Sequence, residues 1–253
     1  MPFDEEDLRL LAKAAQTLNQ FKDINYFNQF AGAVDKVVRL IKQTKKSQLN
    51  ELQPYILFEK VPYLRGYQHL DLIIEAIENN KCLSLVYQKF ENDPSSEFSI
   101  SPYFVKEFHN RWYVIGYNAG KDEVRTYGLD RIVSISLCYD TYKVNESIDI
   151  EAYFKDCIGI NLGNGIVEKV ILSFTHAQGN YIKTQYLHRS QETLKDDDNE
   201  LLVQLNVIIN EELIMMLMSH GDHVKVIEPS SLAEKIAERC ARVAAKYSDN
   251  EPI

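Results

Sequence analysis

Two short runs rich in aromatic and β-branched residues, separated by a polar turn, constrain the fold of this chain more than any other feature. The first run is Arg111–Tyr117, the second is Arg125–Ile132, and turn residues occupy positions 118–121 between them. Aromatic and β-branched side chains favour strands, so the pattern predicts a β-hairpin. The hairpin holds the only tryptophan of the chain together with tyrosines and arginines. Rings beside guanidinium groups can hold a planar or anionic ligand by stacking and by bidentate hydrogen bonds.

Strand patterns continue on both sides of this hairpin. Apolar residues alternate over Leu83–Tyr87, a polar turn leads to the run Phe98–Phe104, and a last strand is predicted at 131–137. A helix precedes them, with apolar residues at Leu70, Ile73, Ile74 and Ile77, and it is expected to end at Asn79-Asn80. Five short strands joined by tight turns predict a small antiparallel barrel or a strongly bent sheet.

The remainder of the chain alternates between strands and helices. Asp149 is a candidate cap for a short helix at 150–156, and a helix is predicted near 179–185. Strands at 169–174, 191–194, 201–209 and 223–227 are interleaved with further helices at 211–218 and 230–247. Antiparallel strands with helices on one side predict an α+β domain.

The N-terminal region is predicted to be helical. Two amphipathic helices, near 8–18 and 26–43, carry apolar faces that they cannot bury against each other alone. We therefore expect them to pack against another chain or a segment outside this sequence, and the prediction is a homodimer. The resulting division is a helical linker or dimerisation segment at 1–66, a barrel domain with its preceding helix at 67–140, a connector at 141–166 and an α+β domain at 167–250. The fold class is α+β.

Composition limits the range of functions. With 45% apolar and 26% charged residues the chain is typical of a soluble globular protein, and no run approaches the roughly 20 apolar residues of a membrane helix. The acidic N-terminus is unlike a signal peptide, so a cytoplasmic location is expected. The net charge of −9 argues against a broad basic face for duplex DNA. The four scattered cysteines are expected to be small buried apolar residues in a reducing compartment.

These residues together resemble the WYL-domain family of bacterial transcriptional regulators. The resemblance lies in Trp112-Tyr113-Val114 (with Val where the family name has Leu), in Arg125 and Leu129-Asp130-Arg131-Ile132, and in Tyr87 and Pro102. The C-terminal segments His188–Gln191, Glu211–Leu213 and Ser219–Pro229 resemble the companion domain that follows WYL in these proteins.

The resemblance implies an Sm-like, SH3-type barrel at 82–138. It also implies a sensing role, in which a small ligand or an oligonucleotide at the barrel modulates an attached DNA-binding domain, usually in a dimer. Family regulators carry a winged helix-turn-helix before the linker, and the helices at 8–43 show no following wing. DNA would then be reached only through a winged helix that this chain does not show.

Six residues are candidates for ligand contact. Arg125 and Arg131 would present guanidinium groups to a phosphate or carboxylate, Tyr113 or Tyr127 would supply a stacking face, and Tyr87 would reach the same pocket through its hydroxyl. Structural alternatives stay open: Asp130-Arg131 as an ion pair at a bend and Arg125 lying over the barrel surface. Trp112 completes the set, although a lone tryptophan on a strand is more often a core residue.

The sequence contains no recognisable catalytic motif. The chain has no Gly-x-Ser-x-Gly elbow and no His-Glu-x-x-His or clustered cysteines, so no enzymatic activity, metal or cofactor is expected. The leading hypothesis is the ligand-sensing region of a transcriptional regulator that binds a small anionic molecule or a short single-stranded nucleic acid. The alternative is a stand-alone interaction module that controls a partner protein without binding DNA itself.

Overall fold

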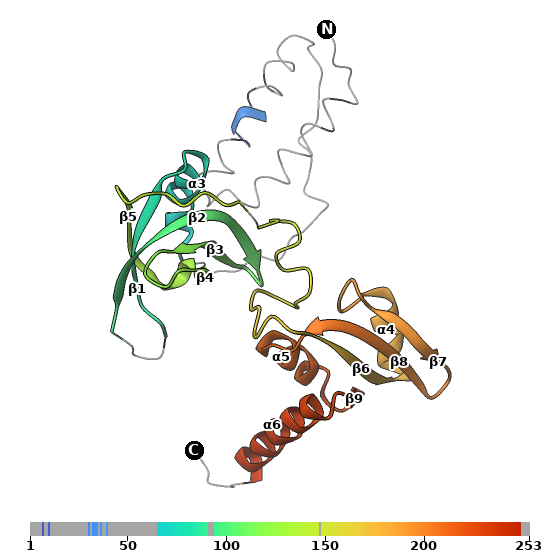
Figure 1. Ribbon diagram of the computed structural model, residues 1–253. Helices are drawn as coiled ribbons and strands as arrows, with labels where there is room; N and C mark the ends of the chain where they lie inside the picture. Colours follow the sequence, from blue (N-terminus) through green and yellow to red (C-terminus); the bar gives the residue numbers. More distant parts are fainter. Residues whose placement is uncertain are drawn as a thin grey trace. The chain divides into compact units, whose positions relative to one another are not determined.

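The computed structural model describes residues 65–90, 94–146 and 148–248, together with positions 7, 10, 30, 32–34, 36 and 39. The chain divides into two compact units, residues 1–146 and 147–253, which are taken one at a time (Figure 1). Apart from those few positions, the two predicted N-terminal helices lie outside the described residues, as does the dimer contact expected of them. In the described ranges there is no winged helix.

The first unit begins with a short helical segment. A 3-10 turn, η2 (Tyr67–His69), leads into the helix α3 (Leu70–Glu78), whose buried residues are Leu70, Ile73 and Ala76. The side chain of Asn79 donates to the carbonyl of Glu75 at 2.8 Å, and Asn80 has a φ of +52°. Asparagine tolerates this left-handed conformation better than most residues. The predicted helix and its end at Asn79-Asn80 are therefore confirmed.

Five antiparallel strands follow, in the order β4-β3-β2-β1-β5. Their bounds are β1 (Cys82–Tyr87), β2 (Ser96–Phe108), β3 (Arg111–Asn118), β4 (Glu123–Gly128) and β5 (Ile132–Cys138), with a 3-10 turn η3 (Leu129–Arg131) before β5. The predicted hairpin of β3 and β4 is confirmed, as are the antiparallel sheet and the α+β class. A closed barrel is not confirmed, because β4 and β5 remain the two edges of the sheet in the part that the structure describes.

The long strand β2 changes partner along its length. It pairs with β1 over Ser96–Ile100 and with β3 over Ile100–Phe108, and its register with β3 shifts between Pro102 and Phe104. An extra residue in one strand bends it and increases its twist. Figure 1 shows the resulting curvature of β2. Among the described residues of this unit a core forms between the bent sheet and α3, and its fully buried side chains include Leu83, Leu85 and Leu129.

The predicted short helix at 150–156 is wrong. Asp149 does accept backbone N–H groups from Glu151 and Ala152, at 3.0 and 3.2 Å, as a helix cap would. The segment nevertheless forms only turns. A run this short has few propagating hydrogen bonds to offset the unfavourable nucleation of a helix, and Gly159, with a φ of +90°, interrupts any continuation.

The second unit has the element order β-α-β-β-α-β with one further helix. The elements are β6 (Val167–Thr175), α4 (His176–Thr184), β7 (Glu192–Asp196), β8 (Glu200–Ile208), α5 (Glu211–Ser219), a 3-10 turn η4 (Gly221–His223), β9 (Val224–Glu228) and α6 (Ser230–Ser248). The sheet order is β7-β8-β6-β9, and all pairs are antiparallel. Alternate residues of β8, among them Leu201, Val203 and Leu205, are buried with residues of α4, α5 and α6 in one core. The predicted α+β arrangement is confirmed.

Helix α4 begins at His176, three residues before the predicted start at Gly179. Because glycine lowers helix propensity, the sequence pattern predicted that the helix begins at Gly179 rather than continuing through it. A Cβ atom at Gly179 would lie 2.7 Å from the Cβ of Leu201, so glycine allows α4 to approach β8 closely. Helix packing, rather than local propensity, explains this residue.

Across the described ranges, none of the helices has both the length and the apolar character needed to cross a membrane.

Candidate ligand-binding site

The 3-10 turn η3 positions the most distinctive polar group of the first unit. Leu129 is fully buried and anchors the turn, while Asp130 and Arg131 project from it. A Cβ atom at Gly128 would lie 2.7 Å from both Asp130 Oδ1 and Arg131 Nη2. The absence of a side chain at Gly128 therefore lets the carboxylate and the guanidinium lie directly against the backbone.

Two aromatic rings lie beside the Arg131 guanidinium. Its central carbon is 5.5 Å from the ring centre of Tyr87 and 5.7 Å from that of Phe90. Attraction between a cation and the face of a ring is effective within about 6 Å. The Arg131 side chain is 27% exposed and the Phe90 ring is largely exposed, so solvent and ligands can reach this group.

The carboxylate of Asp130 lies near two arginines without closing a hydrogen bond to either. Asp130 Oδ1 is 3.7 Å from Arg131 Nε, and Asp130 Oδ2 is 3.9 Å from Arg111 Nε. Both distances exceed the usual hydrogen-bond range. Asp130 Oδ1 and Arg131 Nε are buried and lack a hydrogen-bond partner within the described residues. Such buried unpaired atoms cost about 1–3 kcal/mol each, so this turn holds its charged groups at a cost in stability.

Two tyrosine hydroxyls complete the group. Tyr87 accepts a hydrogen bond from the backbone N–H of Gly128 at 3.3 Å, and Tyr113 lies close enough to Arg111 for that guanidinium to affect its pKa. Burial raises the pKa of Tyr87 and the pKa of Tyr113, and nearby arginines offset only part of that shift. Both hydroxyls therefore keep their protons at neutral pH and can donate to a ligand.

The structure brings Tyr87, Tyr113 and Arg131 together but places Arg125 differently. Arg125 is paired with Glu123 of the same strand, its Nε donating to the carboxylate at 2.6 Å, and its side chain is 44% exposed. Tyr127 is buried and connects the two regions: its ring is edge-on to that of Tyr87 at 5.4 Å. Its hydroxyl accepts a hydrogen bond from Asn118 Nδ2 at 2.7 Å, and burial raises its pKa.

Trp112 lies with the core of the first unit. Its ring is half-buried, edge-on to Tyr67 at 6.5 Å, and packed against the buried cluster. This position agrees with the alternative, given above, that a lone strand tryptophan is a packing residue.

Sequence reasoning missed three contributors to this site: Phe90, Arg111 and Gly128. A glycine immediately before Leu129-Asp130-Arg131, at the end of a strand, was a readable signal for close approach of side chains to the backbone. Arg111 shares a strand face with Tyr113, which was also visible. Nothing local marked Phe90, because it follows β1 in a loop and meets Arg131 only through the fold.

Comparison with known proteins assigns both units. The sequence matches the WYL domain over residues 68–137 and the WCX domain over residues 167–244. The chain contains a WYL domain followed by a WCX domain. No curated protein matches it.

Two solved structures illustrate the similarity. Proteasome accessory factor B/C (PafBC) of Arthrobacter aurescens is 24% identical, with a TM-score of 0.34, over 70% of this chain and 26% of that one. A CRISPR Cas-related protein is 11% identical, with a TM-score of 0.43, over 74% of this chain and 53% of that one. The chain thus spans about a quarter and about half of these proteins. The assignment rests on the two domain matches.

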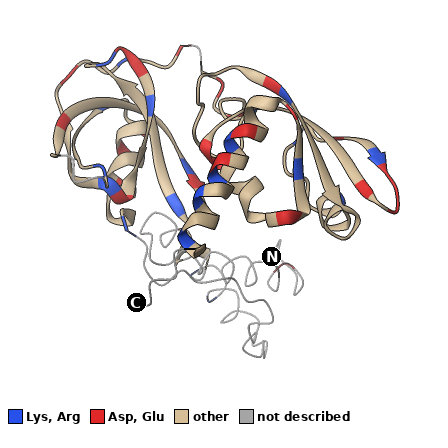
Figure 2. Cartoon of the chain, turned by 90° about the horizontal axis from the view of Figure 1, so that it is seen from below, with Lys and Arg blue, Asp and Glu red and all other residues tan. Residues whose placement is uncertain are grey.

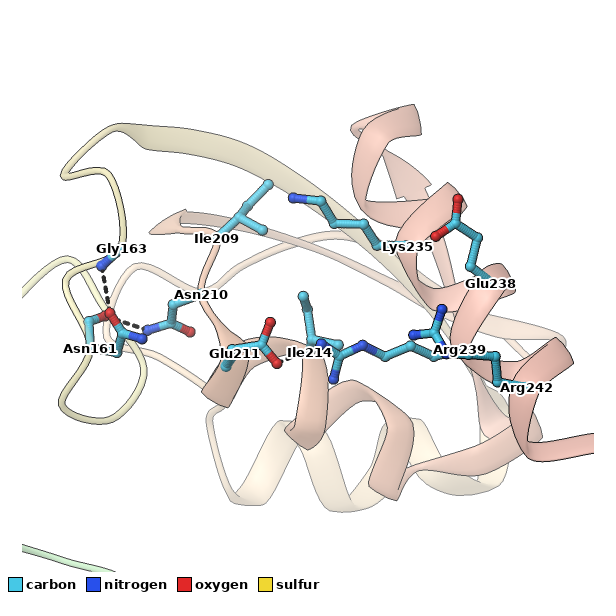
Figure 3. A pocket seen from close by; sticks show the side chains of 10 residues that line it. All are labelled: Asn161, Gly163, Ile209, Asn210, Glu211, Ile214, Lys235, Glu238, Arg239 and Arg242. Carbon is cyan, nitrogen blue, oxygen red and sulfur yellow. Dashed lines mark hydrogen bonds and ion pairs between the residues drawn. The ribbon is translucent and has the colours of Figure 1, made fainter. Parts of the chain in front are cut away.

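The WCX domain holds an open cavity of about 400 Å³ (Figure 3). Basic residues Lys235, Arg239 and Arg242 of α6 line one side, and the loop at 161–163 and the start of α5 line the other. Arg239 is already paired with Glu211, its Nη2 2.5 Å from Glu211 Oε2. The cavity can accommodate a small anion only in competition with this carboxylate, which makes the WYL site the stronger candidate.

In the view of Figure 2, basic and acidic residues alternate along the ribbon of both domains. Within the described ranges, no group of three or more histidine, cysteine, aspartate or glutamate side chains is arranged to hold a metal ion.

Proposed function

We propose that this chain is the ligand-sensing region of a transcriptional regulator, and that its WYL domain binds a small anionic molecule or a short single-stranded oligonucleotide beside η3. Its match to the WYL domain supports a regulatory, sensing role in general. One observation carries the choice of ligand. The Arg131 guanidinium lies within 6 Å of two aromatic ring centres and has a buried Nε without a hydrogen-bond partner among the described residues.

The chemistry of the group suits a phosphate next to a flat ring. Arg131 would pair with a phosphate oxygen, and the exposed ring of Phe90 would stack on a base. Tyr87 and Tyr113, both protonated at neutral pH, would donate hydrogen bonds. The two arginines outnumber Asp130 in this group, so its charge favours an anion.

Three further statements belong to the same proposal. The change of partner along β2, together with the three-residue connection between the edge strands β4 and β5, supports a sheet curled toward an Sm-like barrel. The protein acts as a homodimer, which sedimentation at micromolar concentration tests. It senses its ligand without chemical conversion.

The test is binding of fluorescently labelled single-stranded oligonucleotides of about ten nucleotides, and of labelled mononucleotides, followed by anisotropy. Arg131→Gln is expected to weaken binding by 10-fold or more, because a hydrogen bond to a charged group contributes about 1.5–3 kcal/mol. Arg125→Gln is expected to have a smaller effect, since Glu123 already occupies its guanidinium.

Arg189→Gln is the matched control, because it removes one exposed positive charge from the WCX domain. The Trp112 emission spectrum of each variant verifies that the WYL domain is folded. Unchanged affinity of a folded Arg131→Gln protein for both classes of probe would overturn the proposal.

A further inference from the structure

Two of the four cysteines lie directly opposite each other in the WYL sheet. Cys82 is the first residue of β1, Cys138 is the last residue of β5, and the two are register partners in the antiparallel ladder. Opposed residues in such a ladder have Cα atoms roughly 4.5–5.5 Å apart. A disulfide needs about 4.4–6.8 Å, so the backbone can accept one without moving.

The two sulfur atoms differ in accessibility. Cys82 is 3% exposed, and its Sγ lies 3.6 Å from Ser101 Oγ. Cys138 is partly exposed, and its Sγ lies 3.8 Å from Asp140 Oδ2. Burial raises the pKa of the Cys138 thiol, which keeps it protonated and slow to react at rest. Because Cys138 is the more exposed of the two, an oxidant would meet it first, with Cys82 beside it as the resolving thiol.

We propose that Cys82 and Cys138 form an oxidisable dithiol, which a hydroperoxide converts into a disulfide between β1 and β5. In the first step the Cys138 sulfur attacks the peroxide, the O–O bond breaks, and a sulfenic acid and one water molecule form when hydrogen peroxide is the oxidant. In the second step the Cys82 sulfur displaces the hydroxyl group as a second water molecule and the S–S bond forms. Two thiols are oxidised and one peroxide is reduced.

This site lies where the chain leaves the WYL sheet. Ser101, which contacts Cys82, accepts a hydrogen bond from the backbone N–H of Lys143 at 2.9 Å. Tyr142 donates its hydroxyl to the carbonyl of Pro102 at 2.9 Å. The segment after β5 is therefore hydrogen-bonded to β2 next to the two cysteines. Oxidation would join β5 covalently to β1 and would change the contact between Cys82 and Ser101. Because Ser101 is hydrogen-bonded to Lys143, oxidation would then alter the attachment of the segment after β5 to β2.

The experiment uses the purified chain, reduced and then exposed to hydrogen peroxide at low millimolar concentration. Free thiols are alkylated, and tryptic peptides are examined by mass spectrometry. We expect one peptide pair linked through Cys82 and Cys138, with a mass two hydrogens below the sum of the two peptides, and alkylated Cys157 and Cys240. Oxidation should also raise the thermal midpoint followed by Trp112 fluorescence by on the order of 10 °C, because the bond restricts the unfolded chain.

Cys138→Ser should abolish both the link and the rise in the thermal midpoint, whereas Cys240→Ser, an exposed cysteine of α6, should alter neither. The peptide map of the unmodified chain decides the matter even if Cys138→Ser folds poorly. Recovery of Cys82 and Cys138 as alkylated peptides after oxidation overturns the inference. So does over-oxidation of Cys138 to a sulfinic acid without any link.

Discussion

The WYL and WCX domains are both antiparallel sheets with helices against one core, yet the charged groups considered as ligand sites differ in their surroundings. In the WCX domain Glu212 Oε2 is likewise buried without a hydrogen-bond partner among the described residues, but several of its ion pairs are exposed: Lys195 lies 2.9 Å from both Asp197 and Glu200, and Lys169 lies 2.7 Å from Glu228. In the WYL domain Asp130 and Arg131 are drawn against Gly128 and retain buried atoms without a partner.

The two kinds of charged group differ in what they could gain from binding a ligand. Exposed ion pairs contribute little to stability, since solvent screens them and two long side chains must be held in place. A partly buried guanidinium with an unfilled hydrogen bond has more to gain from a ligand. The comparison therefore directs the search for ligands to η3 rather than to the surface charges of the WCX domain.

The largest expected effect tests whether the two cores are independent. Phe174→Ala removes a fully buried ring from the WCX core and should lower the free energy of unfolding of that domain by about 3–5 kcal/mol. Trp112 is the only tryptophan and lies in the WYL domain, so its fluorescence follows that domain alone. In urea, the far-UV circular dichroism transition should move to lower concentration, while the Trp112 transition stays in place.

Leu85→Ala is the matched change in the WYL core, and it should move the Trp112 transition instead. Equal displacement of the Trp112 transition by Phe174→Ala would show that the domains unfold as one cooperative unit.

A smaller effect is expected at a glycine of the WYL sheet. A Cβ atom at Gly116 would lie 2.6 Å from the backbone oxygen of Ser101 and 3.0 Å from the Cα of Pro102, and backbone atoms cannot rotate aside. Gly116→Ala should therefore destabilise the WYL domain by about 1–3 kcal/mol, measured by urea denaturation with Trp112 emission. At Gly120 the nearest atom is a side-chain oxygen at 3.4 Å, so Gly120→Ala should remain within about 0.5 kcal/mol of the original protein. Equal stability of the two variants would contradict the close approach of β2 and β3.

The smallest effect concerns the exposed ion pairs of the WCX domain. Lys195, together with backbone N–H groups, lowers the pKa of Asp197 to about 2. Because this pKa is depressed in the folded state, its contribution to stability is present above the ordinary pKa of 3.8 and is lost as the pH falls toward 2. Carboxyl NMR titration should show Lys195→Met moving the Asp197 midpoint back toward its ordinary value, with little change in stability at pH 7. An unchanged midpoint would show that Lys195 does not hold Asp197.

The periodicity of the sequence was enough to predict most elements of both domains. Helix α3 ends at Asn79-Asn80 as expected, and the β3–β4 hairpin and the WCX element order follow from runs of apolar residues interrupted by turns. The predicted helix boundary was wrong where packing against a neighbouring strand, rather than the local pattern, determines which residue is used. The local pattern predicts a helix start at Gly179, whereas α4 begins at His176, because Gly179 is the interior position at which α4 lies against Leu201.

The candidate site was only partly predictable for the same reason. Arg131, Tyr87 and Tyr113 were chosen from strand patterns and from resemblance to the WYL family, and the structure places them together. Arg125 could not be distinguished from Arg131 by residue type. The nearby Glu123 pairs with one, whereas Gly128 and two rings surround the other.

By itself the sequence determined which segments form strands and helices, because side-chain alternation and turn residues act over a few positions. The tertiary structure alone decided that Cys82 faces Cys138 and that Phe90 meets Arg131. In both pairs the two residues are far apart in the sequence. Sheet register brings the cysteines together and side-chain packing brings Phe90 to Arg131, and neither can be read from a local pattern.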